Sequence, residues 1–312
     1  MSTTLDIAVA ADDRAALPLA VTLAGVDRHL AEDAVADVRV VTTRMTGPVR
    51  DRLREAAEGW PQTRLSFVDV VADRLAELPE VGHLTRETYL RLLLPELLGT
   101  LESVLYLDAD LLVQRDLSPL ATFDLTGAPL AAVPDAAAPL VGENDGLSFC
   151  FEDAVRPSVS ARTINAGVLI FDLTAWRERH LADRLIAFLA EHAEHLRWAD
   201  QDALNAELGH EIAHLPLAYN VMSLWKTHPP LREDEQERVK TWLADPATAE
   251  VVWHFAGRNK PWKPQSFRSR FRRVYHDALE DSGWFESAAA FKMWQATWAV
   301  RNVARAVKDV AV

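Results

Sequence analysis

Two aspartates that follow a short apolar run, Asp108 and Asp110, are the residues whose types and spacing point most directly to chemistry. The run before them, Val104–Leu107, has no polar alternation, which is typical of a strand buried on both faces of a parallel sheet. Side chains two positions apart in an extended segment point the same way, roughly 6–7 Å apart. Both carboxylates can therefore face a crevice at the carboxyl end of a strand, where open α/β sheets bind ligands. A hard divalent cation carrying a phosphorylated ligand would balance their charge.

The Asp-x-Asp pattern is a weak signal without its context. A second triplet of the same form, Asp200-Gln201-Asp202, is expected to open a helix, whose N-terminus favours negative charge. Only the first triplet follows a buried-strand pattern. Its position in the fold therefore carries the argument for a metal site.

The segments around Asp108 alternate between strand and helix patterns, as in a mainly parallel sheet with helices on its faces. Strands are expected at residues 5–11, 35–42, 64–70, 111–113, 130–133, 164–171, 211–215 and 251–255. Helices are expected at 18–30, 48–58, 87–98, 118–123, 176–196, from 200 onward, 233–243 and 287–312. Residues 134–161 are interpreted as a long surface excursion that shapes a substrate site. No glycine-rich phosphate loop follows the first strand.

Further polar residues stand at the ends of predicted strands, which meet at one edge of such a sheet: Asp12, Asn165 and His254. A divalent ion held by Asp108, Asp110 and His254 would have mixed oxygen and nitrogen ligands, which suit Mn²⁺ better than Ca²⁺. Lys260, six residues beyond the histidine, could reach a diphosphate from the other side. The metal and the lysine would together stabilise a leaving group of roughly −2 or −3 charge. That is the chemistry of breaking the sugar–phosphate bond of a nucleotide sugar.

With these motifs in order, the chain resembles glycosyltransferase family eight. This family comprises retaining transferases, among them bacterial lipopolysaccharide galactosyl- and glucosyltransferases and glycogenin. The resemblance runs from about Leu5 to Trp262, and its motifs are Ala10-Ala11-Asp12-Asp13, Tyr89-Leu90-Arg91, Leu105-Tyr106-Leu107-Asp108-Ala109-Asp110, Asn165-Ala166-Gly167, Asp200-Gln201-Asp202 and His254-x-x-Gly257-x-x-Lys260-Pro261-Trp262. Each motif is modest alone, and their joint order is specific. The chain departs from the family pattern at Arg14, where members often carry Asn or a similar small polar residue.

The resemblance implies a role for each matching residue. The uracil and ribose of UDP would contact Ala10 and Asp12. The metal, Mn²⁺ with Mg²⁺ as the alternative, would be held by Asp108, Asp110 and His254. The pyrophosphate would contact Gly257 and Lys260. The donor sugar would be held by Arg91, Asn165, Ala166, Asp200 and Gln201. The resemblance assigns catalysis to Asp110, Asp200 and Gln201.

The resemblance also implies that the sugar keeps its anomeric configuration. No carboxylate is evidently placed as a nucleophile for double displacement. Gln201 matches the family residue nearest the anomeric face, and an amide is a poor nucleophile. We therefore expect front-face attack by the acceptor hydroxyl, with the departing phosphate oxygen helping to take its proton.

Composition limits the function classes. The formal net charge of −13 argues against general nucleic-acid binding. The single cysteine, Cys150, excludes an intramolecular disulfide framework and a cysteine-rich zinc module. The N-terminus does not resemble a signal peptide, so a cytoplasmic location is expected. A basic stretch from Arg258 to Arg273 precedes an aromatic amphipathic segment, which indicates either peripheral contact with the inner face of the membrane or a helix packed on the domain.

These observations predict an α/β fold of the GT-A nucleotide-diphospho-sugar transferase type. The catalytic domain is expected at residues 1–264 and a helical C-terminal extension at 265–312. The predicted reaction moves a hexose, galactose or glucose, from UDP-hexose to a hydroxyl acceptor, a glycan or glycolipid. Two alternatives are a sugar nucleotidylyltransferase of the same architecture and a catalytically silent UDP-sugar binding protein. The sequence does not decide the sugar, the acceptor, the linkage or the oligomeric state.

Overall fold

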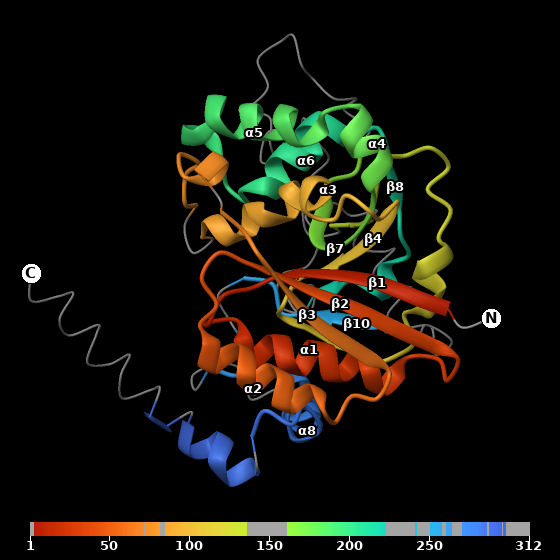
Figure 1. Cartoon of the computed structure of the whole chain (residues 1–312). Helices are drawn as coiled ribbons and strands as arrows, with labels where there is room; N and C mark the ends of the chain where they lie inside the picture. The colour runs from red at the N-terminus through yellow and green to blue at the C-terminus, as the bar shows by residue number, and fades with distance from the viewer. Residues whose placement is uncertain are drawn as a thin grey trace, which may run out of the picture.

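The computed structural model describes residues 3–71, 73–81, 85–135, 161–222, 241, 250–257, 260–263, 270–285, 287–294 and 296–297. A seven-stranded sheet forms the centre of the molecule (Figure 1). In spatial order its strands are β3 (Thr63–Asp69), β2 (Ala34–Thr42), β1 (Thr3–Ala10), β4 (Ser103–Leu107), β7 (Ile164–Asp172), β6 (Leu130–Pro134) and β8 (Ile212–His214). All are parallel except β7, which runs antiparallel to both of its neighbours. The expected mixed, mainly parallel sheet is confirmed.

A second sheet of three short strands lies beyond the carboxyl end of β4. It consists of β5 (Leu111–Val113), β10 (Val252–His254) and β9 (Val221–Met222), with β10 in the middle. β10 is antiparallel to β5 and parallel to β9. Segments more than 100 residues apart in the chain therefore meet beside Asp110.

Helices cover both faces of the central sheet and give it two hydrophobic cores (Figure 1). One face carries α1 (Ala16–His29), α2 (Gly47–Ala57) and α8 (Arg270–Asp281). The other carries the 3-10 helix η2 (Arg86–Leu93) with α3 (Leu94–Leu97), α4 (Leu173–Glu178), α5 (Leu181–Glu191) and α6 (Asp200–Leu208). Alternate side chains of β1 serve opposite cores, because Ile7 and Val9 belong to the first and Ala8 to the second. The remaining short 3-10 helices are η1 (Asp73–Leu75), η3 (Ser118–Thr122), η5 (Ala193–His195) and η6 (Leu217–Tyr219).

Two expected helices differ in the structure. The segment 87–98 is a 3-10 helix followed by the short α3, where Pro95 occupies the first turn and its missing N–H is tolerated. The segment 176–196 is divided into α4, α5 and η5. α5 begins after His180, whose φ of 51° places it in the left-handed region and ends the preceding turn. The helix expected at 233–243, apart from residue 241, and most of the 134–161 excursion lie outside the described residues.

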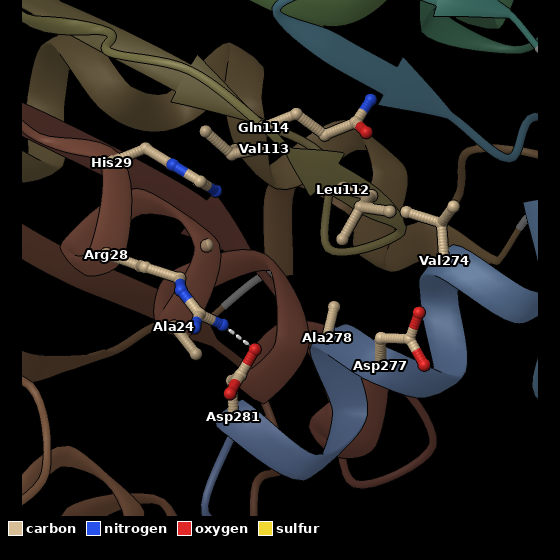
Figure 2. Close-up of a pocket in the computed structure, with 11 residues that line it drawn as sticks. Ala24, Arg28, His29, Leu112, Val113, Gln114, Val274, Asp277, Ala278 and Asp281 are labelled. Carbon is tan, nitrogen blue, oxygen red and sulfur yellow. Dashed lines mark ion pairs between the residues drawn. The ribbon is translucent and has the colours of Figure 1, made fainter.

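Helix α8 packs on the same face of the central sheet as α1. Tyr275 and Leu279 on α8, and Phe291 beyond it, are buried in the first core. A pocket of about 240 Å³ lies between α1, β5 and α8, and an ion pair between Arg28 and Asp281 stands beside it (Figure 2). The domain boundary at 264 and the membrane contact of the basic stretch stay predictions. None of the helices in the described part of the chain combines the length and apolar character that a bilayer-spanning segment needs.

Candidate metal and donor-sugar site

Asp108, Asp110 and His254 come together beyond the carboxyl end of β4. One potential ligand atom from each residue lies within 4.8 Å of those from the other two. The His254 Nε2 atom is 3.4 Å from Asp110 Oδ1 and 3.8 Å from Asp108 Oδ2. His254 is buried and the two carboxylates are partly exposed, so the cluster is open on its acidic side. Two carboxylates and one imidazole at this spacing fit a divalent ion such as Mn²⁺.

Strand pairing explains how a histidine 144 positions beyond Asp110 reaches it. In the small sheet, His254 pairs with Leu111, the residue that directly follows Asp110. The Phe255 N–H then donates a 3.2 Å hydrogen bond to the backbone C=O of Asp110. The register of β10 against β5 therefore places the imidazole beside the carboxylates.

Helix α1 fixes the backbone that carries the aspartates. The buried Thr22 hydroxyl lies 3.0 Å from the C=O of Ala109 and 2.8 Å from that of Leu111, with hydrogen-bonding geometry to each. On the other side, the Asp108 N–H donates to the C=O of Gly167 on β7 at 2.9 Å. The turn that presents the two carboxylates is thus held by α1 on one face of the sheet and by the neighbouring strand β7 within it. We expect it to be preorganised before any ligand binds.

Lys260 forms an ion pair with Asp110 through Nζ and Oδ2, and it also donates to the C=O of Phe255 at 2.7 Å. The chain returns for this contact through Gly257, whose φ of 81° lies in the region that favours glycine. Burial raises the pKa of the Asp110 carboxyl, but the charge of Lys260 and the contact with His254 outweigh it and hold that pKa well below its ordinary value. Asp110 is therefore ionised at neutral pH.

Arg91 is buried between two carboxylates and links the metal cluster to α6. Its guanidinium donates to Asp108 Oδ1 at 3.0 Å and to the C=O of Ala166. Its Nε lies 3.0 Å from Asp200 Oδ2 and donates to the C=O of Thr88. The Thr88 hydroxyl in turn donates to Asp200 Oδ1 at 2.8 Å. The charge of Arg91 is thus shared by Asp108 and Asp200.

Tyr106 contacts both Arg91 and Asp108 in this cluster. The Arg91 guanidinium lies 4.4 Å from the centroid of its ring, and the Tyr106 hydroxyl donates to Asp108 Oδ1 at 3.0 Å. Burial raises the pKa of Tyr106 well above its ordinary value, so the phenol stays a donor. Asp108 Oδ1 therefore accepts two fixed hydrogen bonds, while its Oδ2 faces His254.

The predicted donor-sugar residues on β7 and α6 form one hydrogen-bond network. Gln201 Oε1 accepts from the Asn165 side-chain amide and from the Ala166 N–H, each at 3.1 Å. Asn165 Oδ1 accepts from the Gly167 N–H at 3.0 Å and from the Asn220 amide at 2.8 Å. The structure therefore brings Asn165, Ala166 and Gln201 together with Arg91. They converge because Gln201 lies on the first turn of α6, against the start of β7.

Two buried carboxyls on α6 have raised pKa values. Burial raises the pKa of Asp200. Burial also raises that of Asp202 from 3.8 to about 6, against the backbone N–H groups of Trp198 and Arg197, which donate to its Oδ2 at 2.8 and 2.6 Å. Asp202, the third residue of α6, thus holds the backbone of Arg197 and Trp198 just before the helix. We therefore interpret Asp202 as a structural residue.

The predicted nucleoside residues lie at the end of β1. Asp12 Oδ1 accepts from the backbone N–H groups of Arg14 and Ala15 at 2.9 and 3.3 Å, just before α1. Its Oδ2 lies 3.7 Å from the Arg44 guanidinium. Asp12 therefore shapes the entry to α1, and Ala10, two positions earlier, is the last residue of β1. The Arg14 side chain is largely exposed.

The structure adds four residues to the site that the motifs did not indicate. Thr22, Thr88, Tyr106 and Asn220 each hydrogen-bond a predicted site residue or the backbone beside it. Tyr106 lies within the apolar run and within the Leu105–Asp110 motif, neither of which assigns it a role. Asn220 lies before a two-residue strand, where the sequence carries no signal of its contact with His254.

The match to known families agrees with this geometry. The family model of glycosyl transferase family 8 matches residues 6–266. The chain belongs to glycosyl transferase family 8. The crystal structure of galactosyltransferase LgtC in complex with donor and acceptor sugar analogs is similar, with 26% identity, a TM-score of 0.73 and coverage of 91% of this chain and 97% of that one. This likeness confirms the expected GT-A-type fold.

Two known proteins are similar to the chain in sequence. Lipopolysaccharide 1,2-glucosyltransferase of Escherichia coli (strain K12) is 29% identical over 72% of this chain, and the match spans 62% of that enzyme's length. General stress protein A of Bacillus subtilis (strain 168) is 26% identical over 70% of this chain and 74% of its own length. The name of the first relative describes glucosyl transfer, and that of the second describes no enzymatic activity.

Proposed function

We propose that this family 8 glycosyltransferase moves a hexose from a UDP-hexose to a hydroxyl acceptor, with Mn²⁺ as its metal and retention of anomeric configuration. The observation that carries the proposal is the cluster of Asp108, Asp110 and His254 beside Lys260. One relative is named a glucosyltransferase and one similar solved structure a galactosyltransferase, which supports glucose or galactose as the sugar. A glycan or glycolipid is the proposed acceptor class.

The metal would be held by Asp108, Asp110 and His254, and when bound it would neutralise charge on the departing diphosphate. Lys260 is within reach of the same diphosphate. A cation beside Asp110 would weaken the Asp110–Lys260 pair and leave the ammonium group for the phosphate oxygens. Gly257 would let the backbone approach the same group. Mg²⁺ is the alternative ion. It matches this site less well than Mn²⁺, because Mg²⁺ prefers oxygen ligands and one of the three ligands is an imidazole.

The donor sugar would lie against Arg91, Asn165, Ala166, Asp200 and Gln201. Gln201 Oε1 accepts two hydrogen bonds, so its amide is fixed and serves to position the sugar. Asp200 is bound to Arg91 and Thr88, which leaves it a poor candidate for a free nucleophile. We therefore propose front-face attack by the acceptor hydroxyl, whose proton passes to the departing phosphate oxygen. Asp110, Asp200 and Gln201 are the proposed catalytic residues, and Ala10 and Asp12 the nucleoside contacts.

A donor panel tests this proposal. Purified protein is incubated with UDP-glucose or UDP-galactose and Mn²⁺, Mg²⁺ or EDTA, with water as the acceptor, and released UDP and the anomeric configuration of the freed hexose before it mutarotates are measured. We expect UDP release with at least one donor, most with Mn²⁺ and none with EDTA, and an α-configured product from an α-linked donor. Release that EDTA leaves unchanged would exclude the metal. Metal-dependent UDP binding without turnover would leave the UDP-sugar binding alternative, and formation of UDP-hexose from UTP and hexose phosphate would favour the nucleotidylyltransferase.

A further inference from the structure

Asn220 is a fully buried amide that joins the metal cluster to the donor-sugar network. It follows η6, directly before β9, which pairs with β10 and its His254. Its Oδ1 lies 2.9 Å from His254 Nδ1, and its Nδ2 donates to Asn165 Oδ1 at 2.8 Å. Both polar side-chain atoms of Asn220 therefore have a hydrogen-bond partner, Oδ1 with His254 and Nδ2 with Asn165.

The backbone determines which end of each amide is oxygen. The Gly167 N–H can only donate, so the Asn165 atom that it contacts must be an oxygen. That same oxygen faces Asn220, so the Asn220 atom opposite it must be the NH₂ group. The Ala166 N–H fixes Gln201 Oε1 in the same way, which agrees with the Asn165 orientation. The amide assignment thus rests on two backbone donors.

This assignment extends to the imidazole. With its NH₂ group directed at Asn165, Asn220 presents an oxygen to His254 Nδ1, and that nitrogen must carry a hydrogen to pair with it. In the neutral ring the lone pair is then on Nε2, the atom that faces Asp108 and Asp110. The ring also lies close against the backbone of Gly167, where any side chain would overlap it.

We propose that Asn220 is a positioning residue that fixes the Nδ1–H tautomer of His254, so that Nε2 is available to a divalent cation, and that it connects this ligand to Asn165 and Gln201. The inference rests on the proposed function for the identity of the cation. Loss of an outer partner of a metal-binding histidine typically lowers metal affinity 10–100-fold. Without the Asn220 oxygen, a neutral His254 would favour Nε2–H, which can donate to the carboxylates.

The first test is ¹⁵N NMR of the imidazole in metal-free protein, recorded at alkaline pH so that the neutral ring is observed. The His254 signals are assigned as those lost in His254→Gln. We expect a protonated-type Nδ1 in the wild-type protein and in Asn220→Asp, whose side chain still offers an acceptor oxygen. In Asn220→Ala the hydrogen is expected to move to Nε2. A wild-type His254 that lacks a hydrogen on Nδ1 would overturn the proposal.

The second test measures Mn²⁺ affinity by electron paramagnetic resonance in the presence of UDP. Asn220→Ala should bind Mn²⁺ about 10–100-fold more weakly than wild type. Asn220→Asp keeps the acceptor for His254 but places an oxygen against Asn165 Oδ1, and it should bind Mn²⁺ more tightly than Asn220→Ala. Asn205→Ala is the matched control, because Asn205 is an equally buried amide that bonds the backbone of Ile164 and Gln201 and does not contact His254. It should lose stability without a comparable loss of Mn²⁺ affinity.

Equal Mn²⁺ affinity of Asn220→Ala and wild type would refute the positioning role, as would equal losses in Asn220→Ala and Asn205→Ala. Thermal unfolding of each variant identifies losses that come from misfolding, and Asn220→Asp then decides, because restored Mn²⁺ affinity requires the acceptor oxygen. A wild-type protein that shows the Nδ1–H tautomer but no UDP-hexose turnover would contradict the proposed function and leave the tautomer assignment intact.

Discussion

Gly167 leaves no room for a side chain beside His254. A Cβ atom built on Gly167 would lie 2.4 Å from Cε1 and 2.6 Å from Nδ1 of the imidazole. The Gly167 N–H is also tied to Asn165 Oδ1 at 3.0 Å, so the backbone cannot easily withdraw. The strand β7 therefore provides one wall of the position that the histidine occupies.

Gly167→Ala is expected to displace His254 and to weaken Mn²⁺ binding at least about tenfold. Overpacking should cost about 1–3 kcal/mol of unfolding free energy. Mn²⁺ titration and urea unfolding measure the two effects. Gly47→Ala is the matched control, because a Cβ there meets no atom within 4 Å. Unchanged Mn²⁺ affinity in Gly167→Ala would show that the ring is not held by this wall.

Arg91→Met is expected to lower the free energy of unfolding by about 3–5 kcal/mol, because it leaves Asp108 and Asp200 without their buried counter-charge. Urea unfolding at neutral pH measures the loss. Arg54→Met removes an exposed ion pair with Asp51 and should cost less than about 1 kcal/mol. A comparable small cost for Arg91→Met would mean that the two carboxylates are stable without it.

Asp202 should make the protein less stable as the pH rises. Its pKa is raised from 3.8 to about 6 by burial, so the folded state binds the proton more tightly than the unfolded chain. The associated stability is fully present below about pH 3.8 and is lost as the pH rises through about 6, with a magnitude on the order of 3 kcal/mol. Asp202→Asn keeps an acceptor for the N–H groups of Arg197 and Trp198 and removes this dependence.

Urea unfolding of wild type and Asp202→Asn at about pH 4.5 and 7.5 checks this prediction. The variant should gain stability relative to wild type between the two pH values, since other titrating groups cancel in the difference. A difference that is the same at both pH values would show that Asp202 has no raised pKa in the folded state.

The sequence could predict the parts of the site that follow from strand ends. Asp108 and Asp110 follow the carboxyl end of the parallel strand β4, as expected, whereas Asn165 lies at the start of the antiparallel strand β7 and His254 ends a strand of the second sheet. The pairing of β10 with β5 was the missing step, because a three-residue strand gives no signal of its partner. The order of the family motifs indicated that these residues belong to one site, which the local strand patterns do not show.

The remaining differences arise where tertiary contacts override local pattern. The apolar stripe from 176 to 196 predicted one helix, yet His180 adopts a left-handed conformation that divides it. Asn220 and Thr88 act through hydrogen bonds to residues more than 30 positions away, and such bonds leave no periodicity in the sequence. The roles of such residues can be recognised only once the three-dimensional arrangement of the strands is known.

The most direct test of the account is UDP release from UDP-glucose and UDP-galactose by wild type, Asp110→Asn and Asp124→Asn in the presence of Mn²⁺. Asp124 bonds the Thr126 N–H in an exposed turn and controls for loss of an aspartate. The account predicts at least about a 100-fold loss of turnover in Asp110→Asn, with folding retained, and wild-type turnover in Asp124→Asn. Wild-type turnover in a folded Asp110→Asn protein would contradict metal-dependent hexosyl transfer at this site.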